Sequence, residues 1–158
     1  MKVGGWVSEV RDVGRHLRFI VLRTWDRKIQ LTLKRGVTPD ELFDVTDNLT
    51  QETVLVAYGE PAPEKKARAV DLEVIPERIE VLSRAEPKLP LDPNWKVPAL
   101  LPTRLDNRPL DLRRPEVQAI FKITASLIRG MIDWLDEHGF LMVFTPAIIA
   151  VSYTHLRA

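Results

Sequence analysis

Two side chains in the N-terminal part of this chain are of types that proteins use to bind unpaired nucleic-acid bases. Phe19 lies in the middle of a predicted strand, and an aromatic face can stack on an unpaired base. Gln30 projects from the polar face of the next predicted strand, and its carboxamide can both donate to and accept from a base edge. These two residues make single-stranded nucleic acid the first candidate ligand.

Each candidate residue also has a purely structural interpretation. Phe19 alternates with aliphatic residues, as a core phenylalanine does, and Gln30 has the pattern of a solvated strand residue. Glu73, on the last predicted strand, can accept hydrogen bonds from a guanine edge or face water. Arg11 fits both a nucleic-acid contact and an ordinary surface cation. The pattern alone leaves these alternatives open.

Charge is distributed unevenly along the chain, although the formal net charge is only +1. Residues 11–35 include eight Lys or Arg and two Asp, whereas residues 36–60 include six acidic residues and no Lys or Arg. A segregated basic face can bind phosphates even when the whole chain is nearly neutral. A solvated strand surface has the same composition, so charge does not decide between them.

The candidate residues must be positioned by a small β domain. Alternation and turn residues predict five strands, over residues 2–11, 16–24, 28–34, 53–59 and 69–82. Gly4 and Gly5 predict a bend or bulge in the first strand. Between the third and fourth strands, Thr38 fits a helix N-cap with Glu41 completing a capping box. Leu42, Val45 and Leu49 follow at helical spacing.

The order of three strands, a helix and two strands is that of a five-stranded oligonucleotide-binding (OB) barrel, so the predicted fold class is mainly β. We expect this domain to cover residues 1–82 and a proline-rich hinge to cover 83–104. Pro115 then begins a long amphipathic helix, which Gly139 ends. Its apolar stripe, which a complete domain would bury, consists of Val117, Ile120, Phe121, Thr124, Leu127, Ile128, Met131, Ile132 and Leu135. Without the sheet that it should cover, we expect this stripe to be an exposed apolar patch that is prone to association. A short apolar strand that carries Pro146 is expected next.

Composition excludes several other classes of protein. The chain has no cysteine and only three histidines, which excludes disulfides and thiolate metal sites and disfavours zinc. No apolar run approaches the roughly 20 residues of a membrane span, and the N-terminus lacks a signal-peptide pattern. A cytoplasmic location is therefore expected. No phosphate-cradling glycine loop or nucleophile motif is present.

Residues 104–116, RLDNRPLDLRRPE, are unusually rich in guanidinium and carboxylate groups for a loop. The polar members of this segment are Arg104, Asp106, Asn107, Arg108, Arg113 and Arg114. They either form an internal salt-bridge network or meet a nucleic acid or a partner subunit. We assign them no catalytic role.

This segment and GFLMVFTPAII (139–149) closely resemble the junction and the first motif of class II aspartyl-tRNA synthetases. The resemblance covers nearly the whole chain and is specific for the aspartyl/asparaginyl group. It implies that Arg11, Phe19 and Gln30 hold the anticodon, with Gln30 at the central uridine. It also implies that Glu73 contacts the anticodon's first base and that Pro146 lies at a dimer interface. Seven positions before this glutamate, some members of the family have a small hydroxyl residue, whereas this chain has Lys66.

By this resemblance the chain is the N-terminal part of a homodimeric ligase that uses ATP and Mg²⁺ to join aspartate to its tRNA. Residues 105–150 are then the first helix and strand of a truncated class II α+β catalytic domain, so we expect the fragment to be inactive and to hold no cofactor itself. The last eight residues, 151–158, do not follow the family pattern. The alternatives are an asparaginyl enzyme, an enzyme that charges tRNA(Asp) and tRNA(Asn), or a free-standing OB domain. A lysyl enzyme fits the junction less well.

Overall fold

The chain folds into two compact units, Met1–Pro90 and Leu91–Ala158. The computed structural model describes residues 1–63, 70–94 and 96–146. The first unit is a β barrel with one short helix, and the helices of the second unit follow it in sequence. Within the described ranges, no helix combines the length and the hydropathy that crossing a membrane requires.

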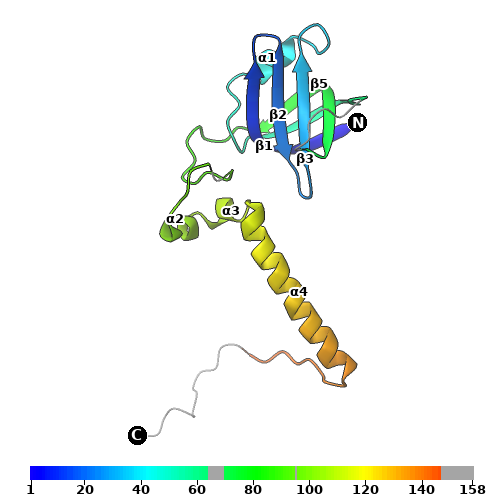
Figure 1. The fold of residues 1–158 in the computed structure, drawn as a ribbon, viewed down its shortest axis with the longest axis vertical. Helices are drawn as coiled ribbons and strands as arrows, with labels where there is room; N and C mark the ends of the chain where they lie inside the picture. The colour runs from blue at the N-terminus through cyan, green and yellow to red at the C-terminus, as the bar shows by residue number, and fades with distance from the viewer. Residues whose placement is uncertain (64–69, 95, 147–158) are drawn as a thin grey trace. The chain divides into compact units, whose positions relative to one another are not determined.

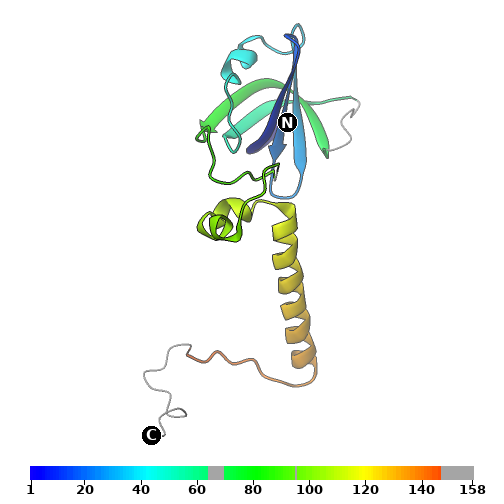
Figure 2. The ribbon, with the colours of Figure 1, turned by 60° about the vertical axis from the view of Figure 1, so that its left-hand side comes forward.

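Five strands form the closed barrel of the first unit, in the order β1-β2-β3-β5-β4 (Figure 1). They are β1 (Lys2–Val13), β2 (Leu17–Arg23), β3 (Lys28–Lys34), β4 (Val54–Pro61) and β5 (Leu72–Ser83). Strands β3 and β5 pair in parallel and the other pairs are antiparallel. Figure 2 shows the long, curved β4 and β5 that close the barrel. The predicted OB barrel is thereby confirmed.

Alternation along the strands places the core inside the barrel. Ile20 and Leu22 of β2 point inward, and both side chains are fully buried. Leu31 of β3 and Val74 of β5 pair across the parallel ladder and are buried in the same core. Each such aliphatic side chain contributes roughly 1.5–3 kcal/mol through burial. The residues between them on each strand therefore lie on the outside of the sheet.

The first strand departs from the prediction in the position of its bulge. The register shifts between Val7 and Glu9, rather than at the two glycines near the start of the strand. Gly5 is required for a different reason, because a Cβ at this position would lie 2.6 Å from the carbonyl oxygen of Arg23. The glycine therefore allows β1 and β2 to approach closely, and the bulge re-aims the strand after it.

The helix between β3 and β4 is shorter than predicted. Helix α1 covers only Glu41–Val45, and Thr38 does not cap it. The Thr38 hydroxyl instead donates to the carbonyl of Lys34 and accepts from its amide, which closes the turn after β3. Phe43 is buried, whereas Val45 is exposed. The length of a short helix on a barrel depends on the surface against which it packs. The spacing of apolar residues in the sequence does not reveal that surface.

The second unit contains α2 (Leu101–Asp106), α3 (Arg108–Asp111) and α4 (Pro115–Glu137). The predicted long helix is confirmed, with a proline in its first turn. Gly139 adopts a φ of 82°, and the amide of Phe140 donates to the carbonyl of Leu135. This left-handed cap ends α4 where the sequence predicts. The predicted hinge is partly helical, because α2 begins at Leu101.

The apolar stripe of α4 is exposed apart from Val117, as expected for a helix without the sheet that would cover it. One prediction for the second unit is wrong. The expected strand around Pro146 does not form over residues 140–146, and 147–149 lie outside the described residues. A helix stripe is buried only against a partner, and a strand needs a neighbour for its hydrogen bonds. Neither partner is present among the described residues.

Candidate nucleic-acid interface

The outer face of the barrel is formed by the residues of β1, β2, β3 and β5 that point away from the core. On β2, Phe19 and Val21 alternate with the core residues Ile20 and Leu22. On β3, Gln30 and Thr32 alternate with the core residues Ile29, Leu31 and Leu33. Figure 1 shows β1, β2 and β3 side by side at the front of the barrel. This outer face carries all four residues that the sequence singled out on the barrel.

Strand register brings these four residues into two adjacent rows. Arg11 of β1 lies opposite Phe19 of β2, and Phe19 lies opposite Thr32 of β3. In the next row, Gln30 lies between Val21 of β2 and Glu73 of β5. Directly opposite residues on one face of an antiparallel pair have Cβ atoms about 4.5–5.5 Å apart, and a hydrogen bond from Thr32 to Glu73 joins β3 to β5 on this face. The candidates therefore form one continuous surface, although Gln30 and Glu73 are far apart in sequence.

Phe19 does not belong to the hydrophobic core. Its side chain is half-buried on the outer face, between the two neighbouring strands. At this point of β2 it is the side chain of Ile20 that points into the barrel, and it is fully buried. Phe19 and Val21 form an apolar row on the outer face, opposite the core row of Ile20 and Leu22. The alternation that suggested a core phenylalanine therefore describes the outer side of β2. The aromatic ring of Phe19 is available for stacking on a planar ligand.

A hydrogen-bond chain links the second row to the first. The Gln30 Nε2 donates to Thr32 Oγ1 at 3.4 Å, and Thr32 Oγ1 donates to Glu73 Oε1 at 2.7 Å. Gln30 and Glu73 are 6% and 7% exposed. Buried polar side chains that are held in this way keep fixed directions. Thr32 was not predicted as a site residue, since its role depends on a partner 41 positions away.

Arg11 is the most accessible of the four candidates. Its side chain is 56% exposed and forms an ion pair with Glu9 at 3.5 Å. Exposed pairs of this kind contribute about 0–1 kcal/mol, so a phosphate can displace the carboxylate at little cost. Arg11 can therefore supply a mobile cation beside Phe19.

The basic segment is largely neutralised by acidic residues that fold back onto it. Arg18 forms an ion pair with Asp47 at 2.9 Å, and Arg23 pairs with Glu52 at 2.8 Å. Arg35 pairs with Asp40 at 3.3 Å. These acids come from the acidic segment, so the separation of charge in the sequence does not persist in space. Among the described residues, the cations of this segment without an ion pair are Arg15, Lys28 and Lys34.

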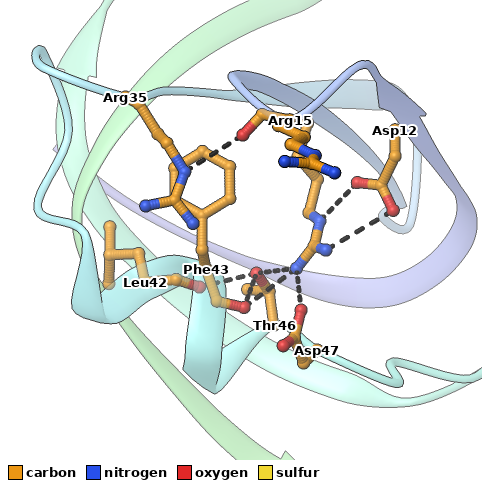
Figure 3. Close-up of polar contacts among 8 residues, drawn as sticks. Asp12, Arg15, Arg35, Leu42, Phe43, Thr46 and Asp47 are labelled. Atoms are coloured by element: carbon orange, nitrogen blue, oxygen red, sulfur yellow. Dashed lines mark hydrogen bonds and ion pairs between the residues drawn. The ribbon is translucent and has the colours of Figure 1, made fainter.

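Arg18 anchors α1 to the strands that carry the outer face. It donates to Asp12 Oδ1 at 2.6 Å, and its NH1 donates to the Phe43 carbonyl and to Thr46 Oγ1, both at 2.9 Å. Figure 3 shows its partners, with Asp12 on one side and Phe43, Thr46 and Asp47 on the other. Burial opposes its charge, but hydrogen bonds with Asp12 and Asp47 outweigh burial and raise the pKa of Arg18. Its neighbour in sequence is Phe19, so this network also holds β2 in place.

We expect Arg18→Lys to lower the free energy of unfolding of the barrel by about 1 kcal/mol, because lysine lacks the planar fork that reaches these acceptors. Urea unfolding followed by circular dichroism measures the change. Arg27→Lys is the matched control, since Arg27 forms its ion pair with its exposed neighbour Asp26. An equal change in both variants would mean that the Arg18 network contributes no more than a surface pair.

The polar junction is an internal network in the second unit. Asp111, which is fully buried, forms ion pairs with Arg104 at 3.0 Å, Arg108 at 3.3 Å and Arg114 at 3.4 Å. The hydrogen bond from Arg104 is the main cause that lowers the pKa of Asp111, and the charges of the three arginines add to it. We call these four residues the arginine cluster. The salt-bridge interpretation of the junction is correct, and its central carboxylate was not singled out in the sequence.

Two other predicted features are placed only in part. Pro146 lies exposed in the segment that follows α4. Lys66 lies outside the described residues, as does the tail from 151 to 158. The described residues contain no group of three or more His, Cys, Asp or Glu side chains that could hold a metal ion.

Comparison with known families agrees with this geometry. Residues 1–82 match the family described as "OB-fold nucleic acid binding domain". Residues 101–156 match the family described as "tRNA synthetases class II (D, K and N)". This chain belongs to the OB-fold nucleic acid binding domain family. A free-standing OB domain does not account for the second match.

The similar proteins are ligases of the aspartyl/asparaginyl group. The chain is 45% identical over 152 residues to the aspartate–tRNA(Asp) ligase of Thermococcus kodakarensis, covering 96% of this chain and 34% of that ligase. It is 47% identical over 150 residues to the aspartate–tRNA(Asp/Asn) ligase of Methanopyrus kandleri, covering 95% and 34%. The chain thus spans about a third of the length of these relatives. The resemblance to this group of synthetases is confirmed.

Solved structures of the same group share the fold. The asparaginyl-tRNA synthetase of Pyrococcus horikoshii, complexed with asparaginyl-adenylate, is 26% identical with a TM-score of 0.75, covering 92% of this chain and 33% of that one. The aspartyl-tRNA synthetase of Entamoeba histolytica is 23% identical with a TM-score of 0.77, covering 96% and 37%. The second likeness concerns the fold alone.

Proposed function

We propose that the outer face of the barrel binds the unpaired anticodon of a tRNA. The observation that carries this proposal is the convergence of Arg11, Phe19, Gln30 and Glu73 on adjacent rows of four strands. A stacking surface, a carboxamide, a carboxylate and a mobile cation are the groups that recognition of single-stranded RNA requires. The membership of the chain in the OB-fold nucleic acid binding family and the match of residues 101–156 to class II tRNA synthetases support the same ligand.

Each residue has a distinct part in this proposal. Phe19 stacks on a base of the anticodon, and the Gln30 carboxamide hydrogen-bonds the edge of the central uridine. Glu73 accepts hydrogen bonds from the first base, a role that suits the donors on a guanine edge. Arg11 contacts a base and the backbone beside Phe19. The bond from Thr32 to Glu73 fixes the carboxylate before RNA arrives, which lowers the entropy cost of binding.

The activity proposed for the whole protein is the ATP-dependent joining of aspartate to tRNA, with Mg²⁺ as the metal ion. ATP and Mg²⁺ would stabilise charge on the transferring groups, and we assign no described residue to holding either of them. The relatives' names include both tRNA(Asp) and tRNA(Asp/Asn) ligases, so the proposed partner is tRNA(Asp), with tRNA(Asn) as the alternative.

A homodimer is the proposed assembly, with Pro146 at its interface, and the proposed location is the cytoplasm. The exposed apolar stripe of α4 is compatible with such an assembly, because contiguous apolar surface of this kind marks a site of association.

Gln30→Ala tests the proposed recognition of the central base. We expect roughly two- to tenfold weaker binding to an anticodon stem-loop with a central uridine, because a base-edge hydrogen bond contributes about 0.5–1.5 kcal/mol. Binding to a stem-loop with a central cytidine is expected to change much less. Fluorescence anisotropy with labelled RNA measures both affinities in the 158-residue chain.

Gln118→Ala is the matched control, since it makes the same chemical change on α4, outside the barrel. Equal losses for the two stem-loops in the Gln30→Ala chain would show that Gln30 does not read the base. Failure of the unaltered chain to bind either stem-loop would contradict the proposed function as a whole.

A further inference from the structure

Trp25 is the most exposed large hydrophobic side chain among the described residues, at 94% exposure. It lies in the turn between β2 and β3, at the end of the barrel away from α1 (Figure 1). Single exposed aliphatic residues are ordinary on protein surfaces. A tryptophan is different, because it presents a far larger apolar area to water. Core packing does not explain its position.

The turn that carries Trp25 is held in shape without the indole. The amide of Thr24 donates to the Arg27 carbonyl at 2.9 Å, and the amide of Arg27 donates to Thr24 Oγ1 at 3.2 Å. Arg27 also pairs with Asp26 at 2.7 Å. At the start of β3, the amide of Lys28 donates to Asp71 Oδ2 at 2.7 Å. The indole is therefore presented on a preformed turn, which reduces the entropy cost of ordering it on binding.

The turn joins β2 and β3, the two strands that carry Phe19 and Gln30 on the outer face. Phe19, Val21 and Arg23 occupy alternate positions on β2, and Lys28 and Gln30 occupy alternate positions on β3. Arg23 lies opposite Lys28 in the last pair before the turn. At about 3.3 Å per residue, the turn begins roughly 10 Å from the row of Gln30. Trp25 is thus too far away to share a base with Gln30, yet near enough to meet the same RNA strand.

The polar residues around the turn favour a nucleic acid over an apolar partner, although Asp26 and Asp71 also lie there. Lys28 is exposed, is without an ion pair among the described residues, and lies on the same side of β3 as Gln30. An aromatic residue and a cation three positions apart in sequence are a combination that can bind a stacked base together with its phosphate. An apolar protein partner would instead require further apolar neighbours, and the residues on either side of Trp25 are Thr24 and Asp26.

We propose that Trp25 stacks on an unpaired base that flanks the anticodon triplet in the same loop. The inference rests on the proposed function, because it extends the RNA strand beyond the row of Gln30. Stacking is tolerant of base identity, so this contact adds affinity without reading sequence.

A double-mutant cycle between Trp25 and single abasic nucleotides tests this contact. We expect Trp25→Ala to weaken binding of the intact stem-loop about tenfold, within the range for one stacked base. The loss of affinity caused by Trp25→Ala is expected to disappear for the one stem-loop that lacks the flanking base on which Trp25 stacks. Trp25→Phe is expected to retain most of the affinity. Leu82→Ala, an exposed apolar residue of β5, is the control.

Several outcomes would overturn the inference. Unchanged binding by Trp25→Ala, together with weakened binding by Phe19→Ala, would remove Trp25 from the interface and leave the proposed function standing. An equal loss against every abasic stem-loop would show that Trp25 does not stack on one base. If neither Phe19→Ala nor Trp25→Ala weakens binding, both proposals fail. Thermal melting verifies that each variant is folded.

Discussion

Phe19→Ala is expected to weaken binding of the anticodon stem-loop by roughly 1–3 kcal/mol, the range for one base stacked on an aromatic side chain. The barrel is expected to keep nearly all of its stability, because Phe19 is half-buried on the outer face and lies outside the core. Binding isotherms and urea unfolding of the same preparations measure the two quantities. A separation between lost affinity and retained stability is the result that the proposed interface requires.

Ile20→Ala is the matched control for this experiment. Ile20 is the next residue on β2, points inward and is fully buried. Its truncation is expected to cost about 2–5 kcal/mol of stability through lost burial and a cavity. A Phe19→Ala chain that melted as low as Ile20→Ala and bound RNA normally where folded would place Phe19 in the core and refute its recognition role.

Asp111→Asn is expected to destabilise the segment of the arginine cluster by about 2 kcal/mol. Removing one partner of a buried ion pair costs about 3–5 kcal/mol of stability. The cost is smaller for Asp111, because solvent screens its interaction with arginines that are partly exposed. Two of the arginines are themselves 25% and 37% exposed. Hydrogen exchange of the amides of residues 107–114 measures the change, which corresponds to roughly 30-fold faster exchange. Asp106→Asn, an exposed neighbour on α2, is the control and is expected to change little.

The same carboxylate gives this segment a pH dependence. Its folded pKa is lowered, chiefly by the hydrogen bond from Arg104, so ionised Asp111 favours the folded state. The stabilisation is fully present above the unfolded pKa of about 3.9 and is lost as the pH falls through the folded pKa. The difference in protection between the unaltered chain and Asp111→Asn is therefore expected to shrink below about pH 4. A difference that stays constant down to the lowest pH would exclude a charged Asp111.

The element order of the barrel was predictable because each signal is local. The alternation of Ile29, Leu31 and Leu33 identifies one face of β3, and the same period-two rule places Gln30 on the other. Pro115 and Gly139 mark the ends of α4 through their own backbone preferences. Such signals depend on a few neighbouring residues and need no knowledge of the rest of the chain.

The face on which Phe19 lies could not be predicted from its strand, because β2 is apolar on both sides. Val21 is buried although it is not part of the core cluster, so hydrophobicity along β2 does not separate inside from outside. The choice is made by the register with β1 and β3, which pairs Phe19 with Arg11 and Thr32. Pairing across strands is a tertiary event.

The sequence by itself determined the strands, the long helix and the residue types able to bind an unpaired base. The tertiary structure alone decided which charges remain available and which residues meet. Glu52 neutralises Arg23, and Glu73 lies beside Gln30, through contacts between segments distant in sequence. Local backbone preferences act over a few residues, whereas Coulomb and hydrogen-bond partners are set by closure of the barrel. For this reason the separation of charge along the chain is lost on folding, while the two rows of the outer face exist only in the folded state.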